Sequence, residues 1–264
     1  MCSFSVTVYV TFLNLPHPEA LQEALMQKIL SRVRRAVEKY DMIKRGDKIC
    51  VGVSGGKDSL VLLSSLAHMR RFEDFSYDVE AVTVDNGIYG DGEDTFASVR
   101  EFCDKLNVNY TVIKTEIGKI VFEEHKEENP CSLCAKLRRG ALHNAAIDLG
   151  CTALALGHHL DDVCETYMMN IILTGRAGCF CPSMEYENSG VKLIRPMIYL
   201  REGEIGSCAS RQTMPVIAKT CPIDGLTERH HFKALLREED KRHRGVYTRV
   251  LGALERSGVD GWHD

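Results

Sequence analysis

The stretch Val51–Leu63 reads VGVSGGKDSLVLL and predicts a buried strand, a tight loop and a helix in immediate succession. The strand is expected over residues 48–53, and the helix is expected to begin at Lys57. Gly55 and Gly56 permit positive φ angles and let the backbone approach a ligand closely. The first turn of the helix leaves N–H groups unpaired beside the positive end of the helix dipole. Such a turn binds anions, and phosphate is a frequent one.

The side chains of the loop strengthen this anion site. Ser54 and Ser59 supply hydroxyl groups, and Lys57 supplies a positive charge. Asp58, directly after the lysine, separates the stretch from the ordinary phosphate loop GxxxxGK[ST]. The segment SGGKDS resembles the signature of the PP-loop ATP pyrophosphatases, which cleave ATP between its α- and β-phosphates. The resemblance implies that this loop holds the pyrophosphate end of ATP.

The composition is that of a soluble globular protein, with 44% hydrophobic and 27% charged residues in a chain of 264. Without a run of ~18 apolar residues, we expect no membrane span and a cytoplasmic location. The net charge of −4 does not indicate a nucleic-acid binder, yet basic blocks precede the loop and follow residue 226. Each block is either a solvated helix face or a cradle for a phosphate backbone. Eleven cysteines in so long a chain favour metal ligation in a reducing compartment over disulfides.

Expected strands alternate with expected helices along the chain. The strands cover residues 48–53, 78–84, 108–113, 152–156 and 191–194, and the helices cover 19–44, 57–70, 94–106, 131–149, 159–173, 201–211 and 226–256; residues 175–190 read as a loop, and 215–218 close the core. The alternation predicts an α/β fold with a parallel sheet and helices on both faces. Ligands bind beyond the carboxyl ends of such strands, so the turns after Val84 and Leu156 should converge with the loop. We expect a leader over residues 1–26, an ATP-binding domain over 27–225 and a basic helical extension over 226–264.

A second polar motif, GHHLDD, begins at Gly157. Asp161 and Asp162 open a helix, where they either complement its dipole or hold Mg²⁺ on the ATP phosphates. His158 is placed to contact phosphate or base, whereas His159 reads as a packed histidine. The motif resembles the GHxxDD element of PP-loop enzymes that thiolate tRNA. This favours the Mg²⁺ role, more strongly for Asp162 than for Asp161.

Cysteines form the third motif. Cys131 and Cys134 have the CxxC spacing of a zinc half-site, a redox pair or part of an iron–sulfur cluster. The run PCSLCAKLRRG, then GHHLDD, RPMIYLRE and a late cysteine before a basic helix, resembles the tRNA 2-thiocytidine synthetases over residues 28–244. The resemblance implies a PP-loop Rossmann-like fold and a [4Fe–4S] cluster held by Cys131, Cys134 and Cys221, with one iron open to sulfur. Cys179 and Cys181 depart from the family pattern.

The same resemblance implies an ATP-dependent tRNA sulfurtransferase acting on a cytidine of the anticodon loop. The C2 oxygen attacks the α-phosphate of ATP, pyrophosphate leaves, and sulfur then displaces AMP to give 2-thiocytidine. Lys57 and Mg²⁺ near Asp162 offset the developing charge, with Cys131 and Cys134 at the sulfur site. The resemblance also implies that backbone groups of Val53 and Val84 hold adenine. Arg138 and Arg139, one turn after the CxxC motif, are placed to meet either tRNA phosphate or the α-phosphate of ATP.

The partners implied by the resemblance are tRNA and a sulfur donor, either free sulfide or the persulfide of a cysteine desulfurase. A homodimer is an open alternative to a monomer. Three other functions remain open from sequence: a tRNA 2-thiouridine synthetase of the related PP-loop group, a zinc-containing PP-loop ligase, and a nucleotide-binding redox sensor.

Overall fold

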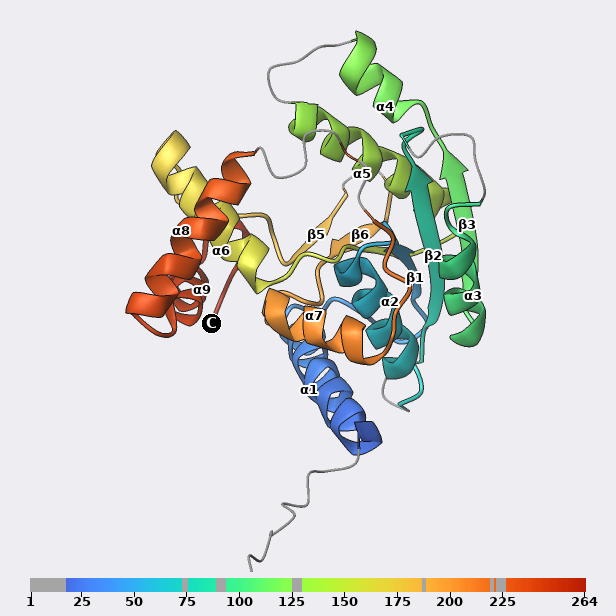
Figure 1. The fold of residues 1–264 in the computed structure, drawn as a ribbon, viewed down its shortest axis with the longest axis horizontal. Helices are drawn as coiled ribbons and strands as arrows, with labels where there is room; N and C mark the ends of the chain where they lie inside the picture. The colour runs from blue at the N-terminus through green and yellow to red at the C-terminus, as the bar shows by residue number, and fades with distance from the viewer. Residues whose placement is uncertain are drawn as a thin grey trace, which may run out of the picture.

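A computed structural model describes residues 18–72, 76–88, 94–124, 130–186, 189–218, 221 and 227–264. Its centre is a six-stranded sheet in the order β3-β2-β1-β4-β6-β5 (Figure 1). The strands are β1 (Lys48–Gly52), β2 (Asp78–Asp85), β3 (Asn109–Lys114), β4 (Ala153–Ala155), β5 (Ser183–Glu185) and β6 (Lys192–Ile194). All neighbouring pairs are parallel except β5 with β6. The predicted α/β fold with a parallel sheet is therefore confirmed, with one antiparallel strand added at its edge.

The central strands are buried on both faces. Successive side chains of a strand point to opposite sides of the sheet. In β1, Ile49 and Val51 enter the apolar core on one face, while Cys50 enters a second core on the other. In β4, Ala155 and Leu154 divide in the same way. Burial on both faces explains why these strands read as continuous apolar runs rather than alternating ones.

Helices cover both faces, as predicted. The helices that pack on the sheet on the side of the first core are α1 (Pro18–Lys39), α2 (Lys57–Met69), α3 (Ala97–Lys105) and α7 (Glu202–Arg211). The second core lies under α4 (Ile117–Lys119), the π-helical turn Ile120–Glu124 and α5 (Pro130–Asp148). Figure 1 shows α5 and α2 on opposite sides of the sheet. The carboxyl ends of β1 and β4 therefore open between these two layers.

Three further helices stand beside the sheet (Figure 1). They are α6 (Leu160–Met169), which continues as a π-helical turn over Asn170–Thr174, α8 (Glu228–Arg242) and α9 (Val246–Ser257), before the 3-10 turn Val259–Gly261. Tyr247, Leu254 and Trp262 are each at most 1% exposed and belong to the first core. The described part of the expected extension thus packs into the core of the ATP-binding domain.

Some segments differ in detail from the sequence expectations. The segment 175–190, expected to be a loop, contains β5. The sequence did not predict this strand, because three residues are too few to show a periodicity. Residues 1–17 of the expected leader lie outside the described residues, and residues 18–26 form the start of α1. In the described part of the chain, no helix combines the length and apolar character needed to cross a bilayer.

Candidate nucleotide and cysteine site

The SGGKDS loop joins β1 to α2 as the sequence predicts. Gly55 has a φ of +75°, and a Cβ at this position would lie 2.8 Å from the side chain of Ile217. The backbone N–H of Ser54 donates to Ser59 Oγ at 3.1 Å, and Ser59 Oγ donates to the carbonyl of Gly56 at 2.8 Å. No side chain caps the start of α2. The turn is thus held by its serines, while the first helical N–H groups keep their capacity for an anion.

A cavity of about 420 Å³ lies against this loop. The sequence-predicted residues that line it are Val53, Ser54, Asp58, Ser59, Val84, Gly157, His158, Arg138 and Arg139. Gly157 closes one side, and a Cβ there would lie 3.3 Å from the backbone of Asp58 and Ser59. The turns after β1, β2 and β4 therefore converge as the sheet topology predicts. Gly55, Gly56, Lys57, Asp161 and Asp162 lie outside the described lining.

The cavity wall is strongly positive. Four arginines line it, namely Arg138, Arg139, Arg195 and Arg229. Asp58 is the only carboxylate among the described lining residues. An excess of guanidinium groups suits a ligand with several negative charges, because each group can donate two parallel hydrogen bonds to phosphate oxygens.

Arg195 carries a charge buried without a carboxylate partner. It is 3% exposed, and burial lowers its pKa from 12.5 to about 10. Its Nε donates to Nδ1 of His158 at 3.3 Å, Nη1 donates to the carbonyl of Cys181, and the guanidinium lies 4.7 Å from the ring centroid of Phe180. Within the described residues no Asp or Glu pairs with it. A charge so placed favours an anionic ligand in the cavity.

His158 is neutral in this environment. Burial and the charge of Arg195 hold its pKa well below the usual range. Its ring lies 4.8 Å from the ring of Phe180, on the cavity wall. From the sequence, Arg195 was noted only as the first residue of RPMIYLRE, without a role, and Phe180 was not noted, because neither residue stands at a spacing that indicates a site.

Lys57 lies outside the described lining of the cavity, and its ammonium group lies between Asp58 and Glu202 of α7. Its Nζ lies 2.8 Å from Oδ1 of Asp58 and 3.2 Å from Oε1 of Glu202. Burial lowers the pKa of Lys57, but the two carboxylates outweigh burial and raise it. Glu202 was not predicted as a site residue, since only the folded chain brings the start of α7 beside the loop.

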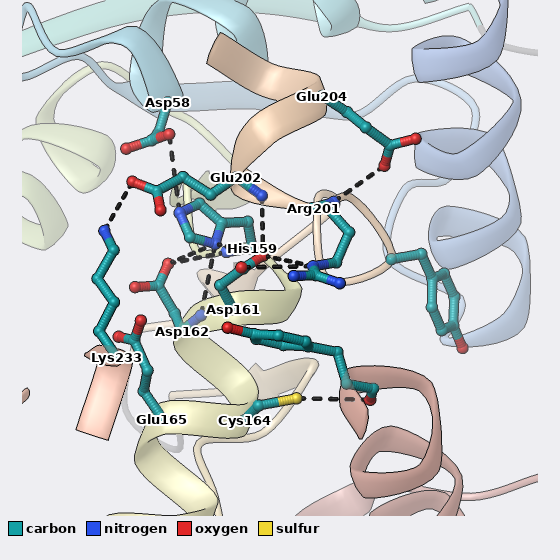
Figure 2. A network of polar contacts seen from close by, with 12 residues as sticks. Asp58, His159, Asp161, Asp162, Cys164, Glu165, Arg201, Glu202, Glu204 and Lys233 are labelled. Carbon is teal, nitrogen blue, oxygen red and sulfur yellow. Dashed lines mark hydrogen bonds and ion pairs between the residues drawn. The ribbon is translucent and has the colours of Figure 1, made fainter. Parts of the chain in front are cut away.

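The two aspartates of GHHLDD point in different directions (Figure 2). Asp161 is buried and accepts from the backbone N–H of Glu202 at 2.8 Å and from Nε of Arg201 at 3.2 Å. Asp162 accepts from the backbone N–H of His159 at 3.0 Å, and its side chain keeps 23% exposure. Asp161 therefore ties α6 to α7, whereas Asp162 stays accessible.

His159 occupies the N-cap of α6 rather than a purely apolar site. Its Nδ1 accepts from the backbone N–H of Asp162 at 3.4 Å, and Nδ1 lies 3.4 Å from the Asp162 carboxylate. On the other side, Nε2 lies 3.7 Å from Oδ1 of Asp58. The imidazole thus stands between the carboxylates of the two motifs.

A further acid, Glu165, is buried one turn after Asp162 in α6. It is 2% exposed, and burial, with the charge of Asp162, raises its pKa to about 7 although Arg229 lowers it in part. Arg229 Nη1 lies 3.2 Å from Glu165 Oε2 and 3.6 Å from Asp162 Oδ1. One residue of the C-terminal basic block therefore reaches both α6 and the cavity.

The CxxC motif opens α5 beside the cavity. Cys131 is exposed and Cys134 is half-buried. The pKa of Cys134 is raised, mainly by burial and in smaller part by the charge of Cys221, while Arg138 offsets part of the rise. Cys221, exposed and distant in sequence, therefore lies near Cys134. Within the described residues no three Cys, His, Asp or Glu side chains already stand in a metal-binding arrangement.

The other described cysteines fall into two groups. Cys50, Cys103, Cys151, Cys164 and Cys208 are buried, as expected of core residues. Cys179 is also buried, with its Sγ 3.5 Å from the carbonyl of Val163, while Cys181 is half-buried.

Comparisons with known proteins identify the family. The PP-loop domain model matches residues 25–220. The tRNA-cytidine(32) 2-sulfurtransferase of Geobacter sulfurreducens is 37% identical over 239 residues, which cover 89% of this chain and 92% of the relative. The enzyme of the same name from Pelobacter propionicus is 34% identical over 245 residues, covering 92% and 90%.

A solved structure shares the fold. The U34-tRNA thiolase NcsA from Methanococcus maripaludis, solved with its [4Fe–4S] cluster, superposes with a TM-score of 0.74 at 27% identity, covering 89% of this chain and 79% of that one. The chain therefore belongs to the PP-loop family, together with the tRNA-cytidine(32) 2-sulfurtransferases.

Proposed function

We propose that this protein is an ATP-dependent tRNA sulfurtransferase that converts a cytidine of tRNA to 2-thiocytidine. The curated relatives carry this activity in their name, with position 32 as the target, and they align along nine-tenths of the chain. Nucleotide 32 lies in the anticodon loop, and a base in a single-stranded loop leaves its stack at low cost.

The observation that carries the proposal is the position of Arg138 between the two sites. This residue lines the cavity beside the SGGKDS loop, and it is also close enough to Cys134 for its charge to lower the pKa of that thiol. One side chain thus connects the nucleotide site to the cysteine site. A reaction that activates a base with ATP and then delivers sulfur to it needs the two sites to be adjacent.

The SGGKDS loop and the arginines that line the cavity bind ATP. The N–H groups at the start of α2 and the hydroxyls of Ser54 and Ser59 receive the pyrophosphate end, with Lys57 as the nearby cation. Val53 and Val84, at the cavity wall, hold adenine. Asp162 and Asp58, which lie on opposite sides of the His159 ring, would hold Mg²⁺, because carboxylate oxygens suit that ion. When bound, Mg²⁺ would neutralise part of the phosphate charge.

The chemistry proceeds in two displacements. The C2 oxygen of cytidine is a poor leaving group, so it first attacks the α-phosphate of ATP and pyrophosphate departs. Sulfide then adds to C2, and AMP leaves with the former oxygen; with a persulfide donor, a thiol has to reduce the S–S bond to release sulfur at this oxidation level. The arginines of the wall stabilise the charge that builds on the α-phosphate in the first step and on AMP in the second. Neutral His158 and the ring of Phe180 limit water on one wall.

The cysteines fit a [4Fe–4S] cluster by their chemistry. Cys131 and Cys134 are one helical turn apart, so their thiols share a face of α5, and Cys221 comes from outside that helix. Three thiolate ligands of this kind suit iron–sulfur clusters. These three residues would hold the cluster, which supplies an open iron position for sulfur when bound. Burial raises the pKa of Cys134 and Arg138 offsets part of that rise, so the positive charge of a bound metal would favour the thiolate that ligation requires.

The proposal also includes the partners. The sulfur donor is free sulfide or the persulfide of a cysteine desulfurase, a homodimer is the alternative to a monomer, and the location is cytoplasmic. Light scattering of the purified protein measures its oligomeric state. Thiolation assays with sulfide or with the desulfurase persulfide as the sole sulfur source distinguish the two donors.

Anaerobic purification followed by iron, sulfide and zinc analysis tests the cluster. We expect about four irons and four sulfides per chain, the content of one [4Fe–4S] cluster. The Cys221→Ala variant should lose or destabilise them, whereas the matched Cys208→Ala variant, altered in the core of α7, should retain them. Stoichiometric zinc without iron would instead favour a zinc-containing PP-loop ligase.

Incubation of the native protein with unmodified tRNA, ATP and sulfide tests the reaction itself. We expect 2-thiocytidine in the digested tRNA, together with AMP and pyrophosphate. A tRNA in which cytidine 32 is replaced by adenosine should not be thiolated. Thiolation of uridine, or of neither base, would contradict the proposed substrate.

A further inference from the structure

The carboxylate of Glu202 is shared by three cations from two elements. Its Oε1 lies 3.2 Å from Nζ of Lys57 and 2.8 Å from Nζ of Lys233, and its Oε2 lies 2.9 Å from Nη2 of Arg237. Lys57 belongs to the phosphate loop, whereas Lys233 and Arg237 belong to α8. Figure 2 shows the side chain of Glu202 extending from the start of α7 to Lys233 of α8.

Glu202 is fixed in this position by its backbone. Its N–H donates to Oδ2 of Asp161 at 2.8 Å, in the first turn of α7, where the helix dipole favours a negative charge. Burial raises the pKa of Glu202, but Lys233 and Lys57 outweigh burial and lower it to about 2. The side chain is therefore ionised at any physiological pH, and it is only 16% exposed.

The position of Lys57 creates a competition. This lysine lies outside the described lining of the cavity and is held by Glu202 and Asp58. To neutralise phosphate, its ammonium group has to leave Glu202. The carboxylate then stays behind, half-buried, and the cost of leaving it depends on the cations that remain. Lys233 and Arg237 are those cations.

We propose that Glu202 is a positioning residue for the phosphate loop, and that Lys233 and Arg237 of α8 set how readily Lys57 passes from Glu202 to the phosphates of ATP. Neither α8 residue lines the cavity, so they act on ATP through the shared carboxylate. When both are present, they satisfy Glu202 and release Lys57. When they are removed, Glu202 retains Lys57 and ATP binds more weakly. This inference rests on the ATP site of the proposed function, but not on thiolation.

A double-mutant cycle on ATP affinity tests the coupling. Binding of ATP with Mg²⁺ to the full-length protein is measured by calorimetry for the native chain, Lys233→Ala, Glu202→Gln and the double variant. We expect Lys233→Ala to weaken binding about three- to tenfold, the range that coupled neighbouring charges produce. In the Glu202→Gln background the same lysine substitution should change affinity less than about twofold, because the shared carboxylate is gone.

Two controls separate this coupling from general effects of charge and folding. Arg242→Ala removes a cation from the same helix whose partners are Glu238 and Glu239, and it should leave ATP affinity unchanged. Lys233→Arg keeps the charge and should restore native affinity, which a merely structural lesion would not do.

An equal loss of affinity from Lys233→Ala in both backgrounds would overturn the inference, since Lys233 would then act on ATP directly. No loss in the native background would overturn it as well. The thiolation assay on the native protein is a separate measurement, so failure of the proposed function and failure of this coupling are distinguishable.

Discussion

Replacement of Arg195 by methionine should raise stability and weaken ATP binding together. The pKa of Arg195 falls from 12.5 to about 10, and each pKa unit corresponds to about 1.4 kcal/mol, so the buried charge costs the folded state about 3 kcal/mol. Its hydrogen bonds to His158 and Cys181 and its contact with Phe180 offset about 1–2 kcal/mol of that cost. Methionine retains the volume and removes the charge.

We therefore expect Arg195→Met to increase the free energy of unfolding by about 1–2 kcal/mol without ligand, a rise of about 3–6 °C in Tm. Loss of a charged hydrogen bond to phosphate should weaken ATP binding about 10- to 100-fold. Thermal melting and calorimetric titration with ATP measure the two effects. Arg139→Met is the matched control, because Arg139 lines the same cavity but is exposed, and it should weaken ATP binding at unchanged Tm.

A lower Tm for Arg195→Met combined with native ATP affinity would refute this reasoning. The guanidinium would then support the fold through its local contacts, and the cavity would not need its charge. The opposite signs are the distinctive expectation, because a stabilising substitution that removes function identifies a residue kept for its ligand.

Three further predictions follow from the described contacts. Gly46→Ala, at a φ of +86° in open space, should cost only the strain of a left-handed backbone, about 1–2 kcal/mol. Gly55→Ala should cost more, because its Cβ would also clash with Ile217. Urea unfolding of the two variants measures the difference, and equal losses of stability would contradict the clash. The pKa of Glu165 is raised to about 7 in the folded state, so the protonated side chain contributes stability that is fully present below about pH 4.5 and is lost as pH rises through 7. The Tm of Glu165→Gln relative to that of the native chain should therefore increase between about pH 5 and 8, and a constant difference would argue against burial of the carboxylate. Trp262→Ala should cost about 3–5 kcal/mol, since this side chain is 1% exposed, and a cost under about 1 kcal/mol would show that the C-terminal segment is peripheral.

The sequence was sufficient for the sheet and for the convergence of its motifs. Val51 and Leu154 lie in strands whose apolar runs are long enough to identify, and parallel topology then brings the loop after β1 close to Gly157. The strand β5 could not be predicted, because a single antiparallel pairing with β6 defines it and no periodicity does.

The charges of the site were less predictable than its backbone. A motif contains only residues that are neighbours in sequence, so Lys57 with Asp58 and Asp162 with His159 were found, but their partners from distant parts of the chain were not. Glu202 reaches Lys57 only because α7 packs beside α2, and Arg195 matters only because the fold buries it without a carboxylate. Such properties arise from tertiary packing and leave no local signature.

The contact between Trp262 and Phe180 has a consequence for the order in which the protein is made. The indole Nε1 donates to the carbonyl of Phe180 at 3.0 Å, and Phe180 forms part of the cavity wall under Arg195. Trp262 follows every residue of the described cavity lining in the sequence. The sheet and the phosphate loop can fold while synthesis continues, since domains form from the N-terminus as the chain emerges. The cavity wall at Phe180, however, gains this hydrogen bond only once the chain has been synthesised as far as Trp262, so a nascent chain that is shorter lacks that support of the wall.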